Sequence, residues 1–376
     1  MSGKEPRKTI LECFAALPDP RVERTREHKL IDIIVIALCA VLCGAEAWTE
    51  VEFFGQVRKK WLRQFLALPH GIPSHDTFGR VFARLDPDRF GVCLLEWMQA
   101  VFQATNGKIV AIDGKTLRGS HDRRGGKAAL HMISAWAQEA HLVLGQVACA
   151  EHSNEITALP ALLGILELSG TLVTIDAMGC QTEIAQEITE RGGEYVLGLK
   201  GNQGRLHEAV ARFFTCAERD AFAHLPQEHV RTVEKDHGRI ERRDYWVVAG
   251  AEWLDPRKEW GLRAVGMVRS ERRTAEGTAR ETRYYILSAP LSGEAFAKAV
   301  RGHWGIENSL HYVLDVAFRE DDCRIRKAHG PQNFAVLRRV ALSLLKKDTS
   351  HKLGIKGKRL CCGWDEAYLV QILFAR

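Results

Sequence analysis

The first part of the chain, residues 1–105, shows apolar residues at helical spacing. Residues 33–47 are mostly apolar, and residues 49–66 repeat apolar side chains near every 3.6 positions. The turn at residues 69–73 contains two prolines and a glycine, and Ser74 after it is a good helix cap. Apolar side chains then recur at i, i+3, i+4 and i+7 from Phe78 to Leu85. These patterns predict an α-helical N-terminal region.

Two arginines, Arg80 and Arg84, lie off the apolar stripe of the last of these helices. A helix, a glycine-containing turn and a second helix with exposed arginines can form a helix-turn-helix, which places its second helix on DNA. A small helical bundle with ordinary surface arginines fits the same pattern. Both interpretations stay open, and Arg80 and Arg84 are candidate DNA contacts.

From residue 106 the apolar pattern changes to alternating strands and helices. We expect strands at residues 108–112, 130–137, 141–149, 171–175 and 195–199, and helices at residues 156–168, 181–191 and 206–214. Residues 229–290 contain four further strand-like stretches separated by charged turns. Helices return at residues 295–316, 333–347 and 365–374, and a basic loop at residues 352–359 precedes the last one.

This order of elements predicts an α/β fold around a mixed sheet. We divide the chain into a helical N-terminal domain (1–105), an α/β core (106–205 and 294–348), a β-rich insertion (206–293) and a C-terminal basic loop with a helix (349–376).

Composition and charge narrow the classes of function. The longest apolar run has 13 residues, whereas a membrane-spanning helix needs roughly 20. None of the ten cysteines forms a C-x-x-C pair, so we do not expect a zinc site held by cysteines. Scattered cysteines of this kind suit a reducing compartment. The net charge is +6, and residues 296–376 alone carry 15 Lys and Arg against 8 Asp and Glu. We expect a bacterial cytoplasmic protein with a polyanionic partner.

Two aspartates follow apolar strands in the same way. Asp113 comes after Ile109–Ile112, and Asp176 comes after Leu172–Ile175. Adjacent strand ends would bring these carboxylates to one edge of the sheet, where open α/β sheets bind ligands. Carboxylate oxygens are preferred ligands of Mg²⁺. Aspartates that merely cap strand ends would show the same pattern, so both interpretations stay open.

A third carboxylate would complete a metal site, and Glu307 is the best candidate. His303, Glu307, His311 and Asp315 follow each other at i+4 spacing, which places them on one face of the predicted helix. A structural ladder of His and Glu side chains is the alternative. Asp315, Glu320 and Asp321 are the other candidates for this third position.

Motifs along nearly the whole chain resemble one known family. They are Asp19-Pro20-Arg21, His28-Lys29-Leu30, Gly71-Ile72-Pro73-Ser74, Asp113-Gly114-Lys115-Thr116, Ser153-Asn154-Glu155-Ile156, Asp176-Ala177-Met178-Gly179, Leu199-Lys200-Gly201-Asn202-Gln203, His303-Trp304-Gly305-Ile306-Glu307-Asn308 and Leu314-Asp315-Val316. In this order they resemble the ISAs1 family of insertion-sequence transposases, which includes the H-repeat-associated proteins and is similar to the wider IS4-like group.

The resemblance implies an RNase H-like fold with a β-rich insertion before the glutamate helix. It implies a DDE triad of Asp113, Asp176 and Glu307 that binds two Mg²⁺ ions, with Mn²⁺ able to substitute. The implied activity is metal-dependent cleavage at the ends of an insertion sequence, followed by strand transfer into target DNA. The implied partners are double-stranded DNA and a second copy of the chain, in the bacterial nucleoid.

The chain departs from the IS4-like pattern around the glutamate. That group has a tyrosine seven residues before the glutamate, where this chain has Val300, and an arginine four residues before it, where this chain has His303. It also has a lysine seven residues after the glutamate, where this chain has Leu314. Basic and polar side chains near the predicted site and in the basic loop are therefore the candidate DNA contacts. They are Lys115, Arg118, Lys200, Asn202, Gln203, Arg301, His303, Lys356, Lys358 and Arg359.

Two other functions remain compatible with this sequence. One is a catalytically inactive, repeat-associated remnant that only binds DNA. The other is a metal-dependent nuclease that cuts DNA without joining it. A strand-transfer assay separates the two from a transposase, because only a transposase yields a joined product.

Overall fold

The computed structural model describes residues 10–102, 109–121, 126, 128–150, 154–236 and 238–374. Within these residues one sheet of nine strands has the order β3-β2-β1-β4-β5-β9-β8-β7-β6. The strands are β1 (Ile109–Leu117), β2 (Leu130–Ala137), β3 (Leu142–Ala148), β4 (Leu172–Ile175), β5 (Glu194–Leu199), β6 (Gln227–Asp236), β7 (Arg239–Ala249), β8 (Ala264–Thr274) and β9 (Gly277–Leu287).

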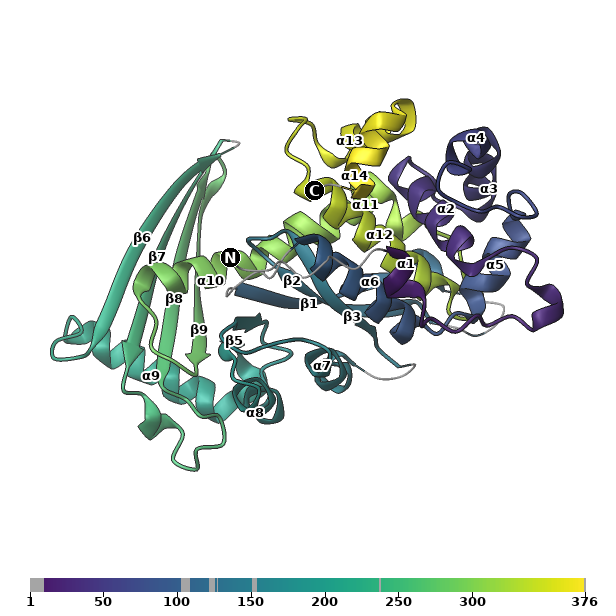
Figure 1. Cartoon of the computed structure of the whole chain (residues 1–376). Coiled ribbons are helices and arrows are strands. Elements are labelled where there is room, and N and C mark those ends of the chain that lie inside the picture. Colours follow the sequence, from purple (N-terminus) through teal and green to yellow (C-terminus); the bar gives the residue numbers. More distant parts are fainter. Residues whose placement is uncertain are drawn as a thin grey trace, which may run out of the picture.

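Helices surround this sheet and form the N-terminal and C-terminal regions (Figure 1). The N-terminal helices are α1 (Ile10–Phe14), α2 (Leu30–Leu42), α3 (Trp48–Val57), α4 (Lys59–Leu62), α5 (His75–Arg84) and α6 (Pro87–Phe102). The later helices are α7 (Glu155–Gly164), α8 (Thr182–Glu190), α9 (Gly204–Arg219), α10 (Gly293–Ile306), the π-helical turn η5 (Glu307–His311), α11 (Tyr312–Phe318), α12 (Gly330–Lys347), α13 (Ile355–Trp364) and α14 (Glu366–Phe374). Short 3₁₀ turns include η2 (Arg118–Ser120) and η6 (Glu320–Asp322).

The predicted helical N-terminal region is confirmed, and it shares its core with the C-terminal helices. Trp48 at the start of α3 stacks on Phe82 of α5 and packs edge-on against Phe334 of α12, with ring centroids 4.7 and 4.9 Å apart. Ser74 caps α5 as expected, since its Oγ accepts a hydrogen bond from the Thr77 amide at 3.3 Å. The packing fixes α5 against α12 (Figure 1).

The sheet core has the predicted mixed, RNase H-like arrangement. β1 is antiparallel to β2 and parallel to β4, and β4 is parallel to β5. Side chains alternate across a strand, so Val110 and Ile112 face the core formed with α7 and α8, whereas Ala111 faces the core formed with α12. Helices therefore cover both faces of the sheet beside β1 and β4.

The β-rich segment continues the same sheet instead of forming a separate one. β9 pairs antiparallel with β5, and β8, β7 and β6 follow as a curved blade (Figure 1). These strands are longer than predicted, because their far halves alternate Arg and Glu and lack the apolar signal of a strand. The hydrogen-bonded ladder nevertheless reaches the pair Thr274 and Gly277 at the tip.

The structure also corrects the predicted end of β1 and the predicted basic loop. β1 does not end before Asp113 but runs on to Leu117 in its ladder with β2; the expected start at Lys108 lies outside the described residues. The predicted basic loop is largely the helix α13, because the cations of its first turns bind backbone carbonyl groups inside the protein. Among the described residues, no helix combines the length and the apolar character needed to cross a membrane.

Candidate active site

The two predicted aspartates occupy equivalent positions on neighbouring parallel strands. In the ladder between β1 and β4 the last pair is Ile112 with Ile175, so Asp113 and Asp176 are the next residues of the two strands. The Asp176 carboxylate accepts hydrogen bonds from the amides of Met178 and Gly179 at 2.9 and 3.4 Å. Beyond this last pair, both aspartates line one cavity.

Glu307 enters this space from the helix that crosses the sheet. α10, η5 and α11 form one continuous helical rod, and Glu307 is the first residue of its π-helical turn. The Tyr312 amide donates to the Glu307 carbonyl, an i→i+5 bond instead of the usual i→i+4 bond. Such turns insert an extra residue and are frequent at functional sites, because they change the direction of the side chains that follow.

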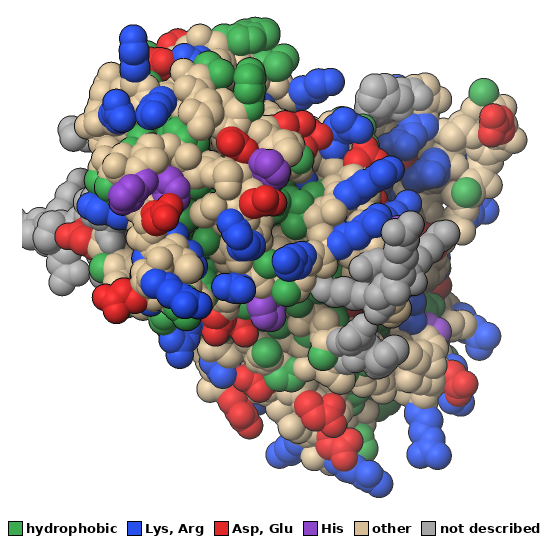
Figure 2. All heavy atoms as spheres, turned by 90° about the vertical axis from the view of Figure 1, so that its right-hand side faces the viewer, with side chains coloured by type: hydrophobic (Ala, Val, Ile, Leu, Met, Phe, Trp, Pro, Cys, Tyr) green, Lys and Arg blue, Asp and Glu red, His purple; other side chains and the backbone are tan. Residues whose placement is uncertain are grey.

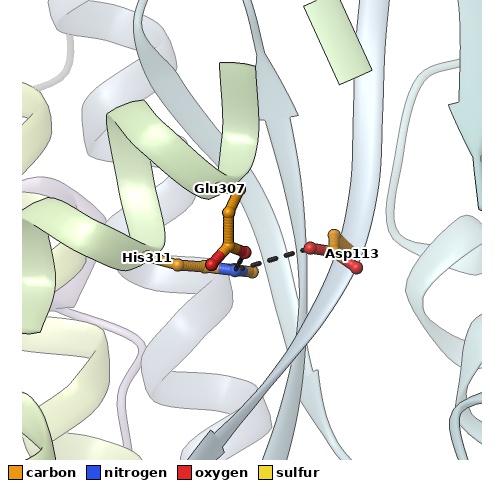
Figure 3. Close-up of side chains that lie close together, drawn as sticks. All are labelled: Asp113, Glu307 and His311. Carbon is orange, nitrogen blue, oxygen red and sulfur yellow. Dashed lines mark hydrogen bonds and ion pairs between the residues drawn. The ribbon is translucent and has the colours of Figure 1, made fainter. Parts of the chain in front are cut away.

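Asp113, Glu307 and His311 converge into one cluster (Figure 3). The His311 Nδ1 atom lies 3.2 Å from a Glu307 oxygen and 3.5 Å from an Asp113 oxygen. One potential ligand atom from each residue falls within 4.8 Å of the other two. His311 is buried, and its Nε2 atom has no hydrogen-bond partner among the described residues.

The charges in this cluster favour a bound cation. Burial raises the pKa of Asp113 to about 6; the nearby His311 and the Gly114 amide lower it, while Glu155 and Asp176 raise it further. The hydrogen bond from His311 lowers the pKa of Glu307. A carboxylate whose ionised form is disfavoured by burial and by neighbouring acids gains strongly from a nearby cation. The carboxylate oxygens of Asp113 and Glu307 suit Mg²⁺ or Mn²⁺, whereas the imidazole of His311 is a ligand that other metals prefer.

Asp176 lines the same cavity without joining the three-residue cluster. The cavity has a volume of about 470 Å³, and Asp113, Asp176, Lys200, His303 and Glu307 are among its lining residues. The structure therefore brings all three predicted triad residues to one cavity. It also adds His311, which the i+4 stripe had contained but which we had not selected as a site residue.

The other candidates for the third carboxylate have different partners. Asp315 and Asp321 lie 2.6 and 3.7 Å from the Lys115 ammonium group. Glu320 is fully buried and forms an ion pair with the buried Arg339 at 2.8 Å. These pairs hold α11 and the turn after it against β1 and α12, and they favour Glu307 as the third carboxylate.

A second His–Glu pair, which the sequence did not suggest, packs beside Asp113. The His131 Nε2 atom lies 2.7 Å from a Glu155 oxygen, and the other ring nitrogen lies 2.8 Å from the Thr116 hydroxyl. A side chain at Gly114 would collide with both His131 and Glu155. The absence of a side chain at Gly114 thus lets this pair approach the backbone next to Asp113.

The predicted DNA contacts near the site fall into three groups. Lys200 is exposed at the cavity, and Arg118 is 82% exposed although Asp321 lies 3.4 Å away. Lys115 is buried in its pairs with the two aspartates. The remaining four side chains bind protein groups: Asn202 donates to the Ala177 carbonyl, Gln203 donates to the Cys180 carbonyl, Arg301 pairs with Glu234, and His303 lies 3.3 Å from the Thr174 hydroxyl.

The predicted contacts away from the site also differ in exposure. Arg80, Arg84 and Lys356 are exposed. Lys358 and Arg359 are buried, so the prediction that they contact DNA is not supported. Lys358 donates to the carbonyls of Leu345 and Asp348, and Arg359 donates to the carbonyls of Val41 and Ala317. Their charges serve the packing of α13.

Two family descriptions match this chain. The description "DDE_Tnp_1-associated" matches residues 11–98, and "Transposase DDE domain" matches residues 105–344. The second match spans more than half of the chain and includes Asp113, Asp176 and Glu307. The chain belongs to the DDE transposase family. The predicted resemblance is thereby confirmed at the level of the family.

Curated relatives agree with this assignment. The H repeat-associated protein YhhI of Escherichia coli (strain K12) is 39% identical over 372 residues, which are 97% of this chain and 98% of the relative. The protein YncI of Escherichia coli O157:H7 is 40% identical over 371 residues, which are 97% of this chain and 94% of the relative. A short relative, the inactive transposase YbfQ of Escherichia coli (strain K12), is 39% identical over 77 residues, which are 20% of this chain and 92% of that relative.

A solved structure gives a weaker likeness. A piggyBac transposase synaptic complex with hairpin DNA superposes with a TM-score of 0.42 and 10% identity, over 97% of this chain and 76% of that chain. At this score the likeness is too weak to align the site residues of the two proteins.

Proposed function

We propose that this chain cleaves DNA at the ends of an insertion sequence and joins the freed ends to target DNA. The observation that carries the proposal is the convergence of Asp113, Glu307 and His311 beside the cavity that Asp176 lines. In a member of the DDE transposase family, this cluster is the expected place for metal-dependent phosphodiester chemistry.

Asp113, Asp176 and Glu307 would hold two Mg²⁺ ions, and Mn²⁺ would substitute. Such ions, when bound, activate the attacking water or 3′-hydroxyl and stabilise the leaving oxygen. His311 holds the Glu307 carboxylate in place through its 3.2 Å contact. Lys200, exposed at the cavity, orients a phosphate of the cleaved strand. This reaction requires no covalent protein–DNA intermediate, and rate comes from positioning and charge neutralisation.

The proposed partners follow from this chemistry. Double-stranded DNA is the substrate at the element's ends and at the target. A homodimer would bring two ends together, and the bacterial cytoplasm, at the nucleoid, would be the place of action. Arg84, Arg118 and Lys356 are exposed and remain candidate DNA contacts.

The first test is cleavage of supercoiled DNA that carries the ends of the element from which the gene comes. We expect nicking with Mg²⁺, none with EDTA, and at least about a hundredfold loss for Glu307→Gln, because a metal ligand is lost. Glu190→Gln is the matched control, because Glu190 is exposed at the end of α8 and this substitution removes the same negative charge as Glu307→Gln. Equal nicking by wild type and Glu307→Gln would refute the assignment of this residue.

Strand transfer separates transposition from the two alternative functions. A transposase joins the cut ends to a target plasmid, whereas a nuclease yields cut ends only. The inactive relative YbfQ makes a decayed copy a specific alternative. Tight binding of the element's ends with no cleavage under Mg²⁺ or Mn²⁺ would assign this chain to that class.

A further inference from the structure

A second cavity, which we call the α5 groove, lies between the N-terminal helices and the segment that follows α11 and η6. Its volume is about 390 Å³. The start of α3 and the first turns of α5 line one side, and residues 324–327 line the other. The groove is therefore built jointly by the two family-matched regions, residues 11–98 and 105–344.

Four cations line the α5 groove: Arg80, Arg324, Arg326 and Lys327. Among the residues that the structure describes, none of the four forms an ion pair with a carboxylate. Arg80 donates to a backbone carbonyl of its own helix, and Arg326 donates to the Gly119 carbonyl at 3.1 Å. Arg324 and Lys327 are exposed, and their side chains have neither an ion pair nor a hydrogen bond within that part of the chain.

Two acids also line the groove, and neither neutralises these cations. The Glu46 carboxylate lies 3.6 Å from Arg319 and 3.9 Å from Arg359, so its charge is shared with other cations. Asp76 is 76% exposed, and among the described residues its carboxylate forms no ion pair with any of the four groove cations. The groove therefore keeps a net positive charge at its surface, over a face on which Lys and Arg side chains gather in several places (Figure 2).

The α5 groove is connected to the active site through β1. Arg326 binds the carbonyl of Gly119, which follows the end of β1, and a side chain at Gly119 would collide with the carbonyls of Asp321 and Cys323. From Asp113 to Gly119 the chain covers at most about 17 Å, from the rise of four strand residues and two 3₁₀ residues. That length corresponds to about five base pairs of duplex DNA.

We propose that the α5 groove binds the phosphate backbone of duplex DNA beside the bond to be cleaved, through Arg80, Arg324 and Lys327. The inference rests on the proposed DNA substrate, but it concerns a surface that does not include Asp113, Asp176 or Glu307. It assigns a role to the DDE_Tnp_1-associated region: α5 contributes one wall of a DNA-binding groove, and the catalytic core contributes the other.

The test is binding of a labelled random-sequence DNA duplex to the full-length chain in EDTA, at a series of KCl concentrations. Each phosphate contact contributes about 0.9 to the slope of log K against log salt. We expect Arg324→Ala/Lys327→Ala to lower the slope by about 2 and to weaken binding on the order of tenfold. Arg80→Ala alone should lower the slope by about 1.

Arg219→Ala/Lys258→Ala is the matched control, because it also removes one arginine and one lysine, on α9 and the β7–β8 connection, that are exposed and form no ion pair among the described residues. An equal loss in the control and the groove variant would overturn the proposal, since net charge alone would then explain both. Unchanged binding in the groove variant would also overturn it, provided that its thermal unfolding matches wild type. Tighter, groove-dependent binding of an RNA duplex would replace DNA as the occupant and overturn it too.

The readout distinguishes this proposal from the proposed function. Binding in EDTA requires no catalysis, so a chain without any cleavage activity can still show the groove-dependent slope. If the protein nicks DNA with Mg²⁺ but wild type and the groove variant have the same salt slope, the proposed function stands and the proposed role of the α5 groove is refuted.

Discussion

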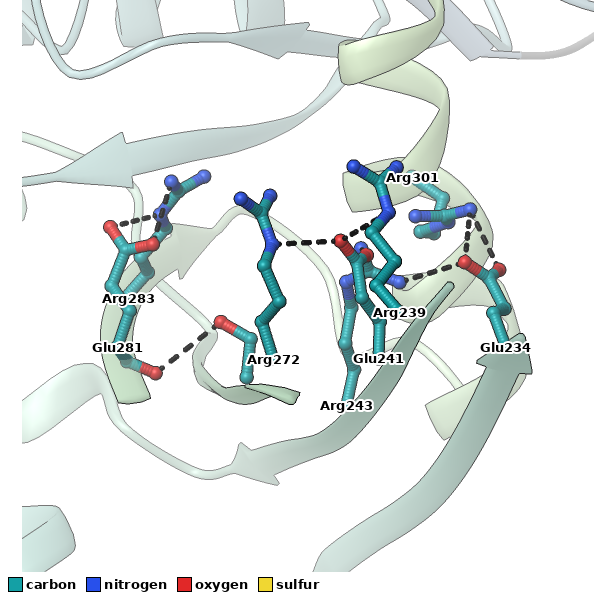
Figure 4. Close-up of polar contacts among 9 residues, drawn as sticks. Glu234, Arg239, Glu241, Arg243, Arg272, Glu281, Arg283 and Arg301 are labelled. Atoms are coloured by element: carbon teal, nitrogen blue, oxygen red, sulfur yellow. Dashed lines mark hydrogen bonds and ion pairs between the residues drawn. The ribbon is translucent and has the colours of Figure 1, made fainter. Parts of the chain in front are cut away.

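The β-rich blade and the α5 groove are both rich in arginine, yet their charges have different neighbours. On the blade face drawn in Figure 4, Arg239, Arg243, Arg272, Arg283 and Arg301 each lie within 3.4 Å of a glutamate oxygen. In the α5 groove, the cations have no carboxylate partner among the described residues. An arginine count therefore does not locate a phosphate-binding surface; the number of unneutralised cations does.

A third use of basic residues appears inside the protein. Lys358 and Arg359 are buried in α13, where they bind carbonyl oxygens in the last turns of α12 and α2. Their charges stabilise the packing of the C-terminal helices and are not available to DNA. The three settings give different predictions for stability and for salt-dependent binding, and these can be measured in the same variants.

The largest expected effect is the loss of stability in Arg359→Ala. The variant removes the guanidinium hydrogen bonds to the Val41 and Ala317 carbonyls, of which Val41 keeps the Gly44 amide as a donor at 3.3 Å. It also removes the contact of the guanidinium with the Phe318 ring at 4.2 Å. We expect the free energy of unfolding to fall by about 3 kcal/mol. Chemical denaturation measures the free energy of unfolding. Lys356 is an exposed residue of the same helix, and Lys356→Ala should change this free energy by less than about 0.5 kcal/mol.

The same two variants also test whether the buried Arg359 contributes to DNA binding. At a temperature where both remain folded, Arg359→Ala should leave the salt slope of DNA binding unchanged. A lower slope in Arg359→Ala than in wild type would show that this buried cation contacts phosphate, contrary to the structure.

The next largest effect concerns Asp348, which lies 3.3 Å from the Lys358 ammonium group. Burial alone would raise the pKa of Asp348, but hydrogen bonds from Ser350, Tyr368 and Lys358 lower it to about 2. Because the folded pKa lies below the ordinary value of 3.8, the ionised carboxylate stabilises the fold above pH 4. This contribution, on the order of 2 kcal/mol, is lost as the pH falls from about 4 to 2.

Acid unfolding of wild type and Asp348→Asn measures this contribution. The variant should be less stable at neutral pH, and the difference from wild type should shrink as the pH approaches 2. A constant difference between pH 6 and pH 2 would contradict the shifted pKa.

The contrast between the regions also shows what the sequence could predict. Asp113 and Asp176 were found because each follows an apolar strand, and the parallel register then places them side by side. Ser74 was found because a helix cap is a local feature. Both signals depend on residues close together in the sequence, so no knowledge of the tertiary structure was needed.

Features that depend on distant partners were missed. The far halves of β7 to β9 are held by cross-strand Arg–Glu pairs and contain few apolar residues, so their length was underestimated. The burial of Arg359 depends on the carbonyl of Val41, far away in the sequence. His311 lay on the i+4 stripe with Glu307, but its contact with Asp113 depends on how the helix packs against β1, which the spacing does not reveal.

A smaller effect is expected when the blade's cations are released. Glu241 is buried and lies within 3.4 Å of both Arg239 and Arg272, and it also pairs with Arg243. Glu241→Gln should lower the free energy of unfolding by about 1 kcal/mol and strengthen DNA binding several-fold, with a slope increase of about 1. Glu276→Gln, at the exposed turn after β8, removes the same charge without releasing these arginines.

If Glu241→Gln and Glu276→Gln strengthen DNA binding equally, the change reflects net charge. The ion pairs between glutamates and arginines then do not keep the blade from binding phosphate. If only Glu241→Gln does so, the blade is a surface whose affinity for phosphate is limited by its own glutamates. The second outcome would support the explanation that the blade and the α5 groove differ because only the blade's arginines are paired with glutamates.

The smallest expected effect comes from adding a carboxylate to the α5 groove. Thr49 lines the groove and is exposed near the start of α3, where an acidic side chain suits the helix N-terminus. Thr49→Glu should therefore leave stability unchanged while its charge offsets one groove cation, which weakens DNA binding about threefold and lowers the salt slope by about 1. Thr49→Gln has the same size without the charge and should bind DNA like wild type. Equal binding by both variants would mean that phosphate does not approach this wall of the groove, and the groove's contact would then be confined to Arg324 and Lys327 on the opposite wall.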